Sequence, residues 1–193
     1  MPTENLTAPM PPMLAYTIHS PVSNNDNIRI MVGQAPNTTY IVPNVPNDAM
    51  YFYFLDRMNP RNKVFELVIP GNQNTAVPTV LQQYMSNPGL IFGMVTKSIL
   101  LTHVPQGALF QYLLSYGASR ALTAVEQLNA QGACGFYGWF TFAMTGQAGP
   151  RTPYPPATYE AGSFYHAALL ELALMPDSKG NPPYGVYDHH AWE

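Results

Sequence analysis

The sequence predicts an α/β fold: a single domain with a mixed, partly parallel central sheet flanked by helices. Short hydrophobic and aromatic runs, typical of buried strands, alternate in the middle of the chain with segments whose apolar residues fall at helical spacing. Proline-rich segments flank this region, and proline disfavours helices and interrupts strand pairing. We therefore expect the domain over residues 28–176, between an extended arm over 1–27 and a second arm over 177–193.

The first half of the domain is expected to consist of strands. "IRIMVG" (28–33) and "TTYIV" (38–42) are short candidate strands separated by turn residues. The continuous aromatic run "MYFYFLD" (50–56) is typical of a strand that is buried on both faces. "KVFELVI" (63–69) alternates and can pair back on it as a hairpin.

The second half mixes helices and strands. Helices are predicted in "NTAVPTVLQQYMSN", with Asn74 or Thr75 as the candidate N-cap, in "PQGALFQYLLSYG", with Gly117 as its stop, and in "LTAVEQLNAQG". "PGLIFGMVT" (88–96) and "CGFYGWFTFAMTG" are predicted strands. "SFYHAALLELALMP" (163–176) fits a helix or a strand, and its continuous apolar character favours a strand.

The predicted core comes from these continuous apolar runs. Its members are Phe52, Phe54, Leu55, Ile91, Phe92, Leu113 and Phe142.

Composition excludes several classes of function. Charged residues make up 10% of the chain, against an average of about 25%, and the net charge is −3. No basic field is therefore expected to hold a nucleic acid. The chain is instead rich in neutral polar residues and tyrosines, and it has 20 prolines. Such a surface costs less to desolvate and favours packing against other protein copies, the alternative being a monomer with little surface charge.

The sequence predicts neither secretion nor a membrane span. "MPTENLTAPMPPMLAY" lacks the basic and apolar regions of a signal peptide, and the most apolar stretch, "ACGFYGWFTFAMTG", is too short to cross a bilayer as a helix. Cys134 is the sole cysteine, so no intrachain disulfide can form, and we expect an inert thiol. His166 lies in an apolar run and is expected in the core.

The tail "YGVYDHHAWE" contains the candidate metal ligands Asp188, His189 and His190, a triplet that matches the name-giving motif of DHH phosphoesterases. Those enzymes need further Asp and His motifs on early buried strands. Here the early acidic candidates are scattered single residues without a nearby histidine, namely Asp26, Asp48 and Asp56. We therefore expect no catalytic residue, no metal site, no cofactor and no enzymatic activity. Tyr184, Tyr187 and Trp192 instead predict an interaction arm, because large aromatic residues anchor interfaces.

His103 belongs to the best-placed polar group, in the loop "TKSILLTHVPQG" after a predicted central strand. Lys97, Ser98 and Thr102 accompany it. No Asp or Glu occurs between residues 67 and 125 to orient His103 as a base, which leaves distant Asp56. We expect a binding residue or an ordinary loop histidine there.

The order of elements over about 50–150 resembles the interleukin-like EMT inducer, or PANDER, domain. The resemblance rests on the "LD" that ends the first hydrophobic strand, on "LLSYGAS" at a helix end, and on the "WFTFAMTG" strand with its trailing Gly-Pro. Members are secreted signalling or carbohydrate-binding proteins, and similar domains occur in bacterial and phage proteins. The family commonly has Arg and Asp before its tryptophan strand, whereas this chain has "GFYG" there, so the resemblance supports the scaffold more than sugar binding.

Two hypotheses about function follow. The first is a non-enzymatic virion structural protein, a bacteriophage head or tail component assembled in the host cytoplasm, whose partners are copies of itself or other virion proteins. The alternative is a carbohydrate-binding module, in which Tyr137 and Trp139 would stack on sugar rings, with His103 as a further candidate binding residue. Buried aromatic residues would favour the first hypothesis, and aromatic residues around a polar cleft the second.

Overall fold

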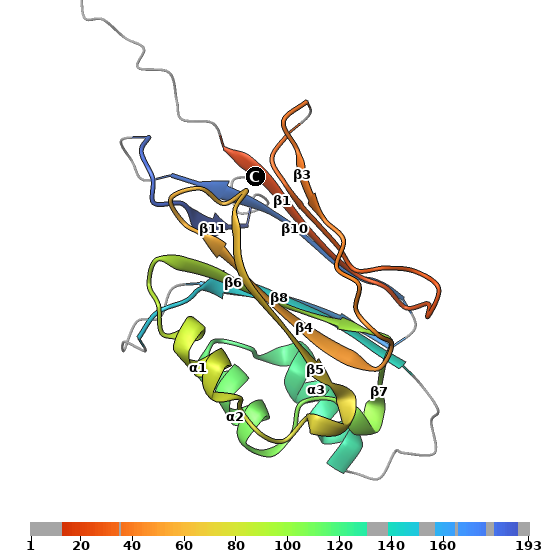
Figure 1. Cartoon of the computed structure of the whole chain (residues 1–193). Coiled ribbons are helices and arrows are strands. Elements are labelled where there is room, and N and C mark those ends of the chain that lie inside the picture. Colours follow the sequence, from red (N-terminus) through yellow and green to blue (C-terminus); the bar gives the residue numbers. More distant parts are fainter. Residues whose placement is uncertain are drawn as a thin grey trace, which may run out of the picture.

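The protein is built from three layers, two antiparallel sheets and one layer of helices (Figure 1). The computed structural model describes residues 13–34, 36–130, 139–150, 157–164, 166–176 and 180–188. The outer sheet has the order β11 (Gly185–Tyr187), β10 (Ala168–Met175), β1 (Leu14–Ser20), β2 (Arg29–Val32) and β3 (Thr39–Ile41).

The middle sheet has six strands and is covered by helices on its other face. Its order is β5 (Lys63–Pro70), β4 (Ala49–Asp56), β6 (Leu90–Lys97) and β8 (Trp139–Gln147), with β7 (Ile99–Leu100) and β9 (Thr158–Ser163) both paired to β8. The helices are α1 (Thr79–Met85), α2 (Gly107–Ser115) and α3 (Arg120–Ala130), with short 3-10 turns η1 (Gly71–Gln73) and η2 (Leu101–His103).

The predicted α/β fold with a partly parallel central sheet is wrong. Every strand pair in the described residues is antiparallel, and the fold is mainly β. Helix α1 does connect two strands that run in the same direction, β5 and β6. Those strands are not neighbours, because β4 lies between them and pairs antiparallel with both.

Parts of both predicted arms are strands of the outer sheet, which further corrects the predicted fold. β1 lies inside the segment 1–27 and occupies a central position between β10 and β2. Its residues alternate between buried and partly exposed, so Leu14, Tyr16 and Ile18 face the middle sheet. β11 lies inside the segment 177–193 and pairs with the end of β10.

β4 is buried on both faces, as its aromatic run predicts. Met50, Phe52 and Phe54 pack against the helices, while alternate residues face the outer sheet. Those alternate residues are Tyr51, Tyr53 and Leu55. All seven predicted core residues are buried, so that prediction is confirmed.

Most predicted elements are confirmed, with local corrections. Residues 63–69 form a hairpin with β4, and the ambiguous segment 163–176 contains a strand, β10. Helix α1 begins at Thr79, after the proline, and neither predicted N-cap is used. The Asn74 side chain instead donates to the carbonyl oxygens of Thr102 and Val104. Gly117, with φ of +91°, ends α2 as predicted.

A chain of buried hydroxyl groups joins the two sheets. The Thr145 hydroxyl donates to the Phe92 carbonyl oxygen (2.6 Å), which leaves its oxygen to accept from the Tyr16 hydroxyl (3.0 Å). The Tyr16 oxygen then accepts from the Tyr53 hydroxyl (2.6 Å). Gly93 makes room for this contact, because a Cβ atom there would lie 2.1 Å from the Tyr53 ring.

We predict that the protein loses stability in alkali through these two tyrosines. Burial raises the pKa of Tyr16 from 10 to about 12 and raises the pKa of Tyr53 well above 10. In the unfolded chain both ionise near pH 10, so their stabilising effect is complete below pH 10 and is lost as the pH rises towards 12. The free energy of unfolding from urea titrations should fall over this range, with the tyrosinate absorbance of the buried tyrosines appearing together with unfolding. Constant stability from pH 10 to pH 12 would contradict the buried network.

Candidate functional site

The polar residues around His103 gather where three strands of the middle sheet end. Asp48 directly precedes β4, while Gly71 follows β5 and Ser98 follows β6. Because β4 is antiparallel to both neighbours, its first residue meets their last residues. The turn η2, which ends at His103, follows β7 at the same end of the sheet.

Asp48 ties these strand ends together through its backbone. Its N–H donates to the Lys97 carbonyl oxygen (2.9 Å), and its own carbonyl oxygen accepts from the Gly71 N–H (2.7 Å). Asp48 has a φ of +57°, a left-handed conformation that Asp tolerates better than most residues. Gly71 is required beside it, since a Cβ atom there would lie 2.5 Å from Asp48 Oδ1.

The Asp48 carboxylate orients His103. Oδ2 lies 2.7 Å from His103 Nδ1, and Oδ1 accepts the Leu100 N–H at 3.1 Å. In the neutral imidazole this contact keeps the proton on Nδ1 and leaves Nε2 as a hydrogen-bond acceptor. Both side chains are partly exposed, so Nε2 can accept a hydrogen bond or a proton from a ligand.

Asp48 is the carboxylate that sequence reasoning missed. It lies 55 residues before His103 and outside the range 67–125 that has no acidic residue. Asp48, and not Asp56, is the carboxylate that bonds His103. The available signal was its place two residues before the continuous aromatic run 50–56. Only the antiparallel pairing of β4 with β6 brings Asp48 beside the segment that carries His103.

Ser98 and Lys97 do not extend this pair into a catalytic group. Ser98 is buried with a φ of +45°, and its hydroxyl has no hydrogen-bond partner within the described part of the chain. Lys97 Nζ donates instead to Val45 O (3.0 Å) and Asn27 Oδ1 (3.2 Å), away from His103. The arrangement therefore provides an oriented histidine without an activated nucleophile bonded to it.

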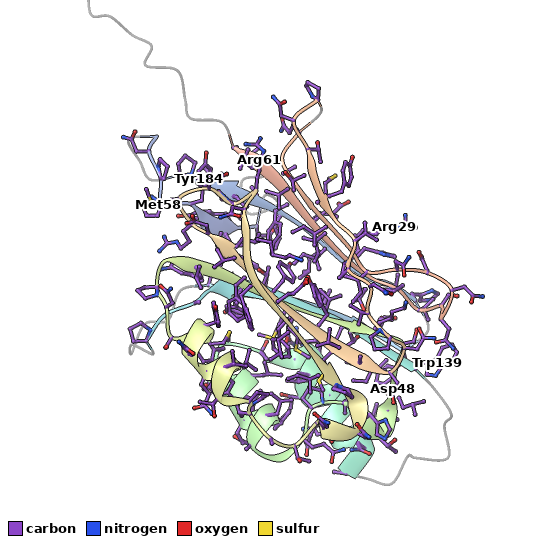
Figure 2. The ribbon with its side chains drawn as sticks, in the orientation of Figure 1. Arg29, Asp48, Met58, Arg61, Trp139 and Tyr184 are labelled. Carbon is purple, nitrogen blue, oxygen red and sulfur yellow. The ribbon has the colours of Figure 1, made fainter. Side chains whose placement is uncertain are left out.

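The structure brings Trp139 to the same end of the middle sheet as His103. Trp139 begins β8 and pairs with Leu100 of β7, three residues before His103, and it is 38% exposed. Figure 2 shows Trp139 and Asp48 at this end of the sheet. Tyr137, the other predicted stacking residue, lies outside the described residues.

The start of the tail is held by the protein itself. Arg57 Nε donates to the Tyr184 carbonyl oxygen (2.7 Å), and the Tyr184 N–H donates back to the Arg57 carbonyl oxygen (2.8 Å). Burial lowers the pKa of Arg57. Tyr184 also packs against the core between the sheets, whereas Tyr187 of β11 is 43% exposed. Tyr184 thus anchors the tail internally, and Tyr187 is accessible to a partner.

Of the other candidates, four lie outside the described residues and one is exposed. His189, His190 and Trp192 lie outside the described residues, as does Cys134. His166 is exposed, so the prediction of a core histidine is wrong. It lies in the turn before β10, where its backbone N–H donates to the Ser163 hydroxyl oxygen. Within the described ranges, no three His, Cys, Asp or Glu side chains are grouped so that they could hold a metal ion.

Two cavities lie along the side where β9 of the middle sheet faces β10 and β11. They have volumes of about 280 Å³ and about 200 Å³, and Tyr159 lines both. The larger is lined also by Glu160, Leu169, Leu170, Glu171, Leu172 and Asp188, and the smaller by Gln147, Ala157, Gly185, Val186 and Tyr187. The Glu160 carboxylate stabilises the fold, because it accepts hydrogen bonds from the backbone N–H groups of Ser119 and Ala121 at the start of α3.

Comparisons with protein-family models, with curated proteins and with solved structures found no match to this chain. The resemblance to the PANDER domain over about 50–150 therefore stays a prediction. No helix among the described residues is long and apolar enough to span a membrane. The function has to be inferred from the geometry of this chain.

We predict that Asp48 acts mainly as a structural link at this end of the sheet. Asp48→Ala removes both carboxylate contacts and places a residue that disfavours positive φ in a left-handed conformation, so it should lower the free energy of unfolding by about 2–4 kcal/mol. Asp48→Asn keeps an acceptor and tolerates the conformation, so its loss should be smaller. Urea unfolding of both variants measures this, and wild-type stability of Asp48→Ala would rule the link out.

Proposed function

We propose that this chain is a non-enzymatic structural subunit of a virion, a bacteriophage head or tail component that packs against neighbouring subunits. The observation that supports this proposal most strongly is the open face of the outer sheet. The middle sheet is covered by the helices on one face and, except along β5, by the outer sheet on the other, whereas the outer sheet is packed on one face only (Figure 1). On the open face, Tyr40, Leu169 and Tyr187 are 68%, 48% and 43% exposed.

Part of this face carries little charge, which supports contact with other protein surfaces. The row that crosses β3, β2, β1 and β10 consists of Tyr40, Met31, Thr17 and Glu171, with a single ionisable carboxylate, while a neighbouring row adds Arg29 beside His19. Burying such a surface removes apolar area from water and desolvates few charges. Exposed tyrosines add large, rigid contact area with a hydroxyl that can find a partner.

The burial of aromatic side chains also favours assembly over glycan stacking. Most of the largest fully buried side chains are aromatic and belong to the two cores, including Phe52, Phe54, Phe92, Phe140 and Phe142. The exposed aromatic residues Tyr40, Trp139 and Tyr187 lie on three different strands. This distribution fits a packed scaffold whose remaining aromatic surface is spread over contacts with neighbours.

We predict that the full chain self-associates as its concentration rises. Leu169→Lys places a charge on the open face of the outer sheet and should weaken the association, whereas Leu128→Lys on α3, at a similarly exposed site, should not. Sedimentation velocity over a wide concentration range measures the effect, with circular dichroism as the control for folding. A chain that stays monomeric at every concentration would contradict the proposal.

A second candidate function is the binding of a neutral saccharide in the smaller cavity beside Tyr159. Its volume of about 200 Å³ suits one sugar ring. Its lining combines the aromatic rings of Tyr159 and Tyr187 with the side-chain amide of Gln147, groups that suit stacking and hydrogen bonding to hydroxyls.

This second candidate predicts an effect at Tyr159 rather than at the predicted stacking residue. Tyr159→Ala should weaken binding of a neutral oligosaccharide about tenfold, a loss of about 1.4 kcal/mol, while Trp139→Ala leaves it unchanged. Calorimetric titration of a panel of neutral oligosaccharides measures both. Loss of binding only in Trp139→Ala would instead support the site at the end of the middle sheet.

A further inference from the structure

The free edge of the middle sheet is formed by β5. This strand pairs with β4 on one side, and on its other side no strand among the described residues pairs with it. Figure 1 shows it as the outermost strand of the middle sheet, in front of β4. It is eight residues long, and the backbone N–H and C=O groups on its free side can pair with another strand.

The side chains of β5 make this edge apolar. Phe65 and Leu67 pack against the core on the helix side, so the residues between them project from the opposite face. On that face Val64 is 45% exposed and Val68 is 36% exposed, because the outer sheet does not cover them. Glu66 stands between the two valines.

The two charges on this edge neutralise each other. Lys63 Nζ forms an ion pair with the Glu66 carboxylate, and the Tyr51 hydroxyl donates to the same carboxylate at 2.6 Å. The bonds from Lys63 and Tyr51 lower the pKa of Glu66, so the carboxylate stays charged and paired. The edge therefore has no net charge to repel a partner.

A bulge and a proline protect only the ends of β5, and the charged side chain in the middle of the strand, Glu66, is paired with Lys63. The pairing with β4 is irregular beside Phe54 and Leu55, close to the start of β5, and Pro70 is its last residue. Lys63, the residue type that most often blocks edge pairing, is engaged with Glu66. The stretch 64–69 is left open to a further strand.

We propose that β5 pairs antiparallel with β5 of a second copy of this chain, joining two middle sheets across a two-fold axis. A two-fold contact places the same patch on both sides, so a charged patch would repel itself, while this neutral and apolar patch can meet its copy. Antiparallel pairing is the geometry that a two-fold axis imposes on two identical edge strands. The inference rests on the proposed function and names one of the contacts from which the assembly is built.

The test compares lysine substitutions on this edge in the full chain. Val68→Lys places an unpaired charge within the apolar edge that pairing would bury, so it should raise the dimer dissociation constant at least about tenfold, measured by sedimentation velocity. Leu128→Lys, at a comparably exposed position on α3, is the matched control and should leave it unchanged. Val64→Lys is the second variant if Val68→Lys loses its fold by circular dichroism.

The possible outcomes distinguish β5 pairing from the more general proposal that the chain assembles with copies of itself. Weakened dimers in Val68→Lys or Val64→Lys, with unchanged dimers in Leu128→Lys, support β5 pairing. If the wild type self-associates and both folded edge variants do so equally well, β5 pairing is overturned while assembly through the open face of the outer sheet stands. If the wild type is monomeric at every concentration, both proposals fall.

Discussion

The burial of β4 on both faces is the constraint on which the rest of the structure depends. Its side chains are large on both sides, so each face needs its own cover. Helices supply one cover and the outer sheet supplies the other. The Tyr16–Tyr53 hydrogen bond then links the two sheets at a point that Gly93 leaves open. This arrangement places the least covered surfaces at the outer sheet and at the edge formed by β5.

Local elements were predictable because their signals are local. The aromatic run of β4, the hairpin with β5 and the end of α2 at Gly117 all follow from short sequence patterns. The topology was not predictable in this way, because nothing local shows that β4 separates β5 from β6. β1 was not predicted, because the prolines near it indicated an extended arm although Leu14, Tyr16 and Ile18 alternate as in a strand.

The same limit applies to the candidate site. The loop signal identified His103, and the carbohydrate-binding hypothesis named Trp139. Both lie at one end of the middle sheet, but neither signal could supply Asp48 from 55 residues away. The Asp48 carboxylate holds the end of the sheet and orients one imidazole, and no serine in the described part of the chain is hydrogen-bonded to that imidazole. A scaffold whose polar links hold its own strands, and whose exposed surface is apolar and poor in charge, suits a protein that works by contact with its neighbours.

The central claim is that two copies of this chain join through the free edge of β5, and hydrogen–deuterium exchange of the full chain at low and high concentration tests it most directly. Backbone amides on a free strand edge exchange quickly, and pairing with another strand protects them. The account predicts that the amides on the free side of residues 64–69 become protected as concentration rises, while amides of α3 exchange at the same rate throughout. Exchange in β5 that does not change with concentration, in samples that sedimentation shows to be associated, would contradict it.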